Sequence, residues 1–332
     1  MRTAQALLAV MWTGVTAYAL FGGADFGAGF WDLLAGGPQR GSAQRKLIEQ
    51  AIGPVWEANH VWLIFVLVVL WTGFPEAFAA IASSLYVPLT LVAVGVILRG
   101  AGFAFRKAVT GVALERLFGA TFAASSVITP FFLGAIAGAV ASGRVPAGTA
   151  EAHPIHSFVN PTSVLGGALA VVVCAYLAAV YLMADADQAD DPGLVEAFRR
   201  RALAAGVVAG GLALGGIAVL RADAPELFSG LTGRGWPLVA ASALTGVVSL
   251  ACVWRRRFAA GRFPAAAAVT AVLWGWAAGQ YPYLLVGELT VGQAAADPVA
   301  LRAVLLSLAV GAVLIAPSLA ALFAAQRGTV RD

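Results

Sequence analysis

Long apolar blocks separated by short polar connections run along the whole chain. Most blocks are roughly 19 to 25 residues long and nearly free of charge, which is the length an α-helix needs to cross a hydrocarbon core about 30 Å thick. Proline or glycine marks most of the connections, as expected where helices end. The blocks predict nine helices, at 4–35, 50–73, 77–98, 118–141, 162–183, 202–220, 236–254, 264–285 and 300–325.

This pattern predicts an all-α integral membrane protein with about nine transmembrane helices. A bilayer offers the backbone no water, so a spanning segment must satisfy its own hydrogen bonds. The blocks also lack the short alternating segments of a membrane β-barrel. We expect a single polytopic membrane domain over 1–332, with approximate halves at 1–141 and 162–285 and a further helix at 300–325.

Composition supports the same fold class. Of the 332 residues, 60% are hydrophobic and only 11% are charged, and a soluble domain of this length would carry far more charge. Cys174 and Cys252 lie in different apolar blocks with no Cys or His at ligand spacing, so we interpret them as small buried side chains. We therefore expect no metal site, and we expect membrane lipids to surround the chain.

Basic residues alternate between the two sets of loops. One set holds 16 of the 21 Lys and Arg: Arg40, Arg45, Lys46, Arg99, Arg106, Lys107, Arg116, Arg199, Arg200, Arg201, Arg255, Arg256, Arg257, Arg262, Arg327 and Arg331. By the positive-inside rule this set is cytoplasmic, so the N-terminus is predicted outside and the C-terminus inside the cell. The same alternation accounts for the net charge of +4, so we expect no nucleic-acid partner.

Two carboxylates fall inside predicted spans, where ionisable groups are costly and are candidates for function. Asp25 lies among glycines in the first helix, about 15 Å from the cytoplasmic end, and Glu57 lies in the second, about 11 Å deep. The two carboxylates lie at comparable depth on adjacent antiparallel helices, so we predict a proton pathway through Glu57 and Asp25. The alternative is that both only satisfy backbone or arginine partners.

His60 is assigned to the same predicted proton pathway, and four further residues support it. His60 is the only histidine inside a span, and it either bonds Glu57 or a partner subunit or ligates a haem alone. Arg99, where the third helix meets the cytoplasm, either anchors the interface or pairs with Asp25 or Glu57. The supporting residues are Trp56, Asn59, Trp62 and Arg99. We find no catalytic or cofactor-binding motif in the chain.

Four segments in the first half carry a family resemblance. They are Gly23–Gly29, Gly53–Leu63 with its Trp56-Glu57-Ala58-Asn59-His60-Val61-Trp62 run, Arg99–Phe103, and Asn160–Gly167. In order and spacing they resemble subunit II of the cytochrome bd-type ubiquinol/menaquinol oxidases. The second half matches mainly in helix count and in Tyr281-Pro282-Tyr283. Some relatives have Asp where Glu57 stands and Gln where His60 stands, which argues against an indispensable haem-ligating role for His60.

The resemblance implies a subunit of a bacterial terminal oxidase that oxidises quinol and reduces dioxygen to water in the cytoplasmic membrane. It implies two four-helix bundles plus a peripheral helix, a haem-bearing subunit I as partner, and small single-helix accessory subunits. Haem b and haem d would belong to subunit I, and a structural quinone would lie in this chain. The competing interpretation is a proton-coupled secondary transporter that uses Asp25 and Glu57. The quinone type and a variant without haem d remain open.

Overall fold

Thirteen α-helices, one π-helical turn and a two-stranded hairpin make up the part of the chain that the computed structural model describes, residues 2–37, 39, 41–53, 56–108, 111–148 and 153–328. Arg40, Pro54, Val55 and Arg331 lie outside it. The elements are α1 (Arg2–Ala17), η1 (Tyr18–Gly22), α2 (Gly23–Leu33), α3 (Ser42–Ile52), α4 (Trp56–Gly73), α5 (Pro75–Ser84), α6 (Tyr86–Ala108), α7 (Val112–Ala141), α8 (Pro161–Gln188), α9 (Pro192–Asp223), α10 (Pro225–Thr232), α11 (Trp236–Trp254), α12 (Phe258–Gln280), β1 (Tyr283–Leu285), β2 (Leu289–Thr290) and α13 (Pro298–Gly328).

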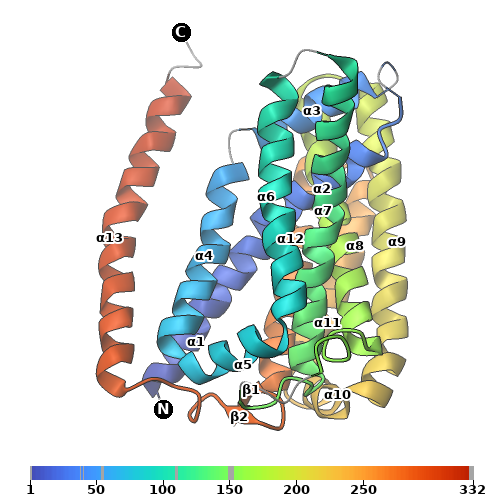
Figure 1. The fold of residues 1–332 in the computed structure, drawn as a ribbon. Coiled ribbons are helices and arrows are strands. Elements are labelled where there is room, and N and C mark those ends of the chain that lie inside the picture. The colour runs from blue at the N-terminus through green and yellow to red at the C-terminus, as the bar shows by residue number, and fades with distance from the viewer. Residues whose placement is uncertain are drawn as a thin grey trace.

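Eight of these segments are long and apolar enough to cross a membrane, which confirms the prediction of an all-α membrane protein. Helix α13 adds a shorter apolar stretch, Pro298–Leu314. It stands at the edge of the bundle beside α1 and α4 (Figure 1). The helices α3 and α6 reach the upper end in that view, which carries Arg45, Arg106 and Arg199; we call it the basic end.

The predicted helices 50–73 and 77–98 each prove to be two helices. Helix α3 ends directly before Gly53-Pro54, a pair that breaks helices because glycine costs entropy and proline restricts the residue before it. Glu57 therefore lies in the first turn of α4. The chain breaks again at Leu85, because Pro88 has no N–H to donate to an extension of α5.

Other helix ends also differ from the prediction. Helix α6 continues to Ala108, so Arg99 lies inside a helix and not at its end. Helix α12 ends at Gln280, because Pro282 disfavours a helical conformation of Tyr281, and the chain then turns into the β1–β2 hairpin. The predicted helix 264–285 therefore begins six residues earlier and ends five residues earlier.

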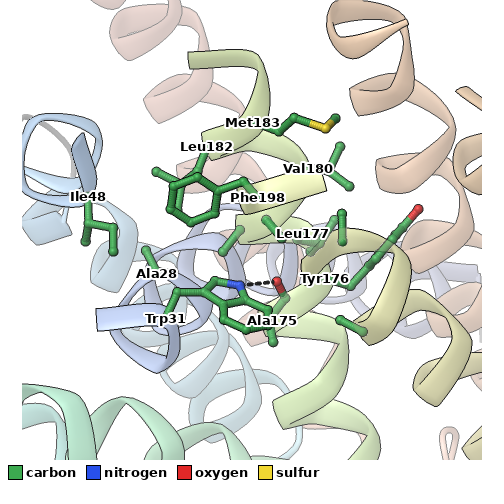
Figure 2. Packing of buried hydrophobic residues seen from close by; sticks show 14 of the residues in the cluster. Ala28, Trp31, Ile48, Ala175, Tyr176, Leu177, Val180, Leu182, Met183 and Phe198 are labelled. Carbon is green, nitrogen blue, oxygen red and sulfur yellow. Dashed lines mark hydrogen bonds between the residues drawn. The ribbon is translucent and has the colours of Figure 1, made fainter. Parts of the chain in front are cut away.

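The largest buried cluster joins both predicted halves. It draws residues from α2, α3, α7, α8, α9, α11 and α12, with helix α8 at its centre. Figure 2 shows Trp31 of α2 packed among these side chains, with its indole N–H donating to the carbonyl of Ala175, 2.8 Å away. The first and second sets of four spans thus share one core, and the division into two bundles remains a prediction.

Helices α2 and α8 cross at very short range. A Cβ built on Gly27 would lie 1.8 Å from the carbonyl oxygen of Cys174, closer than any side chain can approach. Small residues permit such contacts, which replace the hydrophobic effect as the force that holds helices together in lipid. Gly27 therefore fixes α2, and with it Asp25, against the central helix.

The first span is interrupted where α1 meets α2. Residues Tyr18–Gly22 form the π-helical turn η1, in which each N–H bonds the carbonyl five residues earlier. Such turns are frequent at functional sites. This one lies immediately before Asp25.

Candidate functional site

Asp25 is buried in the first turn of α2, with 6% of its surface exposed. The side-chain amide of Asn59, on α4, donates to its carboxylate oxygen Oδ2 at 2.6 Å and more weakly to the carbonyl of Phe21 at 3.4 Å. The sequence predicted a carboxylate held between these two antiparallel helices. The structure gives it Asn59 as its partner.

Arg99 is fully buried, so it is not an interfacial anchor. Its guanidinium donates from Nη2 to the main-chain carbonyl of Asp25 at 3.1 Å and from Nε to the hydroxyl of Ser126 at 3.2 Å. The rings of Phe26 and Phe122 lie 4.9 and 5.0 Å from its Cζ, within range for cation–π attraction. The predicted association with Asp25 is present, through the backbone of that residue.

One donor of Arg99 has no bond within the described part of the chain. Its Nη1 is buried and finds no acceptor among those residues. A buried donor of a charged group normally has a partner, protein or water, because leaving it unpaired costs about 1–3 kcal/mol. Arg99 can therefore hold a water molecule next to Asp25.

His60 lies beside Tyr18 and Phe26. Its Nδ1 is 3.4 Å from the hydroxyl of Tyr18, and its ring centre is 6.0 Å from that of Phe26. His153 and His156 lie before α8, at the end opposite the basic end. The histidines of the described chain thus include no pair that could ligate a haem from both sides.

Glu57 is exposed on the surface of the isolated chain, whereas Asn59 on the same helix is buried. Two residues of an α-helix differ by about 200° around its axis, so Glu57 points away from the Asn59–Asp25 contact. The structure therefore does not bring Glu57 and Asp25 together.

The two predicted supporting tryptophans pack on aromatic rings. Trp56 packs on Phe103 at 5.5 Å between ring centres, and Trp62 packs on Phe65 at 6.1 Å.

A second buried carboxylate on α2 escaped the sequence analysis. Asp32, with 4% of its side chain exposed, accepts from Arg106 Nη1 at 3.0 Å and lies 3.2 Å from Arg45 Nε. It lines a cavity of about 470 Å³ at the basic end. The missed signal was its spacing, because a residue seven positions after Asp25 falls on the same helix face.

The site thus combines a buried carboxylate, a buried guanidinium and neutral hydrogen-bonding side chains. Glu, Asp and His side chains inside membranes commonly form proton relays, and a carboxylate held by one amide can exchange its proton with water. In the described chain, no three His, Cys, Asp or Glu side chains are grouped so that they could hold a metal ion. The chemistry that these residues can perform is proton transfer.

Known proteins match this chain at several levels. The family described as cytochrome bd terminal oxidase subunit II matches residues 3–325. Cytochrome bd ubiquinol oxidase subunit 2 of Bacillus subtilis is 28% identical over 51% of this chain and 48% of its own length. Cytochrome bd-I ubiquinol oxidase subunit 2 of Escherichia coli is 26% identical over 50% and 44%. The matches thus span about half the length of these curated relatives.

The fold has a close counterpart among solved structures. The structure of bd oxidase from Geobacillus thermodenitrificans superposes with a TM-score of 0.77 over 97% of this chain and 98% of the other, at 23% identity. At that identity the likeness concerns the fold. The match to the family, in contrast, covers almost every residue. The resemblance found in the sequence is confirmed, and the chain belongs to the cytochrome bd terminal oxidase subunit II family.

Proposed function

We propose that this chain is subunit II of a bacterial respiratory quinol oxidase, a complex that couples quinol oxidation to the reduction of dioxygen to water. Family membership supports this, and so does the intramembrane chemistry. In this proposal the haem-bearing subunit I is the partner, haem b and haem d belong to that partner, and the basic end faces the cytoplasm. A structural quinone and small accessory subunits are further expectations.

The function of this chain within the complex is to carry protons inward from the cytoplasm. Reduction of dioxygen consumes protons, so a buried reaction centre needs a polar route to it. The observation that carries this proposal is the Asp25–Asn59 contact at 2.6 Å beside the fully buried Arg99. The side chain of Glu57 is exposed in the isolated chain. It belongs to the proton route only if the partner subunit or water covers it in the complex.

The assembly is tested first. Purification by a tag on this chain is expected to yield a complex with haem absorption and quinol-dependent oxygen consumption. A colourless chain that moves a solute into vesicles would instead support the transporter interpretation, which family membership does not favour.

The proton route is tested by replacing Asp25 with Asn in the purified complex. Haem content is checked by absorption, and proton uptake is followed with a pH dye after the reduced complex is mixed with dioxygen. We expect haem to be retained and proton uptake to slow by about 100-fold, a typical effect of losing a proton-transfer group. Asp25→Glu keeps a carboxyl group and is the matched variant, expected to recover much of the rate.

Each result has one interpretation. Normal uptake by Asp25→Asn with full haem content would refute the proton role of this site. Loss of haem together with activity would show that Asp25 serves assembly, and that too would contradict the proposal.

A further inference from the structure

The cavity of about 470 Å³ at the basic end lies among four helices. Asp32 of α2, Arg45 of α3, Arg106 of α6 and Ala120 of α7 line it. Two guanidinium groups flank the Asp32 carboxylate, with Arg106 Nη1 at 3.0 Å and Arg45 Nε at 3.2 Å. A buried carboxylate that lines a cavity wide enough for water can exchange protons with that water.

A second, narrower space borders this cavity. It shares Arg45 and Arg106 with the first, and Phe103 and Phe122 also line it. Its volume of about 10 Å³ is close to the smallest space that holds one water molecule. The space therefore lies between the two arginines that flank Asp32 and the ring of Phe122.

Polar groups continue from Phe122 to Asp25. The guanidinium of Arg99 lies over the Phe122 ring at 5.0 Å and donates to the hydroxyl of Ser126. Ser126 in turn faces Gly29, where a Cβ would come within 2.1 Å of its oxygen. Arg99 also donates to the main-chain carbonyl of Asp25, and its Nη1 has no acceptor among the described residues.

Helix geometry places the two carboxylates in line. Asp25 and Asp32 are seven residues apart on the regular helix α2, which is about 700°, or 20° short of two turns. They are separated by about 10.5 Å along the axis. Gly29 lies between them on the same face. This distance is too long for direct transfer and suits a short chain of water molecules.

We propose that this cavity is the mouth of the proton route and that Asp32, not Glu57, is the carboxylate that collects protons for Asp25. The inference rests on the proton role proposed above. A proton from water in the cavity binds an Asp32 oxygen, weakening its bond from Arg106, and then passes to water on the Arg99 side. Only O–H bonds form and break, and the carboxylate is regenerated.

The test replaces Asp32 with Asn in the purified complex and follows proton uptake with the same dye. We expect haem content to be kept and uptake to slow by about tenfold or more, with recovery in Asp32→Glu. The control is Asp185→Asn, which also removes a carboxylate paired with an arginine, Arg262, at the same end but away from the cavity. It is expected to take up protons at the unsubstituted rate.

A second variant leaves the ion pairs in place. Ala120 is exposed and lines the cavity, so Ala120→Cys can be modified by a bulky thiol reagent in the assembled complex. We expect modification to slow proton uptake several-fold, whereas the same reagent leaves the unsubstituted complex, with its native Cys174 and Cys252, unaffected. Comparison of one sample before and after modification removes any effect on folding.

The outcomes separate this inference from the proposal beneath it. Slow uptake in Asp25→Asn with normal uptake in both Asp32→Asn and modified Ala120→Cys would overturn the entrance and leave the route through Asp25 intact. Slow uptake in Glu57→Gln alone would place the entrance on α4 and also overturn it. Normal uptake in Asp25→Asn would overturn both.

Discussion

Replacing Gly27 with alanine should force α2 and α8 apart. The added Cβ would lie 1.8 Å from the carbonyl oxygen of Cys174, while real Cβ atoms essentially never come within 3.0 Å of such an atom. The two backbones would have to separate by about 1.2 Å, because neither atom belongs to a flexible side chain. Overpacking of this kind costs about 3 kcal/mol, the upper part of its usual range.

Gly211 of α9 supplies the matched control. It is exposed, and a Cβ there would meet nothing within 4 Å, so Gly211→Ala should be neutral or should stabilise by up to about 1 kcal/mol through helix propensity. The assay heats the purified complex in detergent and measures the fraction that remains assembled by size-exclusion chromatography. We expect a midpoint several degrees lower for Gly27→Ala and an unchanged or higher one for Gly211→Ala. Equal midpoints would show that the α2–α8 crossing is looser than the structure has it.

Two predictions concern the end of the bundle opposite the basic end. Asn160→Ala removes the side-chain oxygen that accepts from the Ser163 N–H at the start of α8, and should lower stability by about 1 kcal/mol in the same heating assay, with recovery in Asn160→Asp. Asp223→Asn weakens the contact of α9 with Arg144 and with the hydroxyl of Thr162, and should cost about 1–3 kcal/mol; an unchanged midpoint would show that water replaces these bonds.

The existence of the spans follows from the sequence because lipid imposes a simple requirement. Every spanning helix must be long and apolar, so hydropathy alone marks it, and eight of the predicted segments meet that test. The short helices α3, α5 and α10 were not predicted, because they lie beside the spans where length and hydropathy carry little information. The helix breaks before Trp56 and at Leu85 depend on prolines. The hydropathy pattern does not show whether a proline within a long apolar run ends the helix.

The site could be predicted only in part. Asp25 and Asn59 were named because each is a polar residue within a long apolar run, but the residue predicted to work with Asp25 was Glu57, and the structure brings Asn59 to it instead. Arg99 was misplaced, because a charge followed directly by glycines at the end of an apolar run indicates a helix end, whereas the helix continues past it. The orientation of Glu57 depends on the rotation of α4 about its own axis, which helix ends alone do not set.

The π-turn η1 divides the first span into two helices, α1 and α2. The extra residue in the turn rotates the side chains of α1 about the helix axis relative to those of α2. Removing one residue between Tyr18 and Gly22 would restore a continuous α-helix and would rotate everything before it by about 100° relative to α2. Leu7 would leave its buried place, and the indole of Trp12 would lose the Leu273 carbonyl. The π-turn therefore acts as a spacer that lets α1 bury Leu7 and bond the Leu273 carbonyl while α2 presents Asp25, the residue of the proposed proton route, to Asn59.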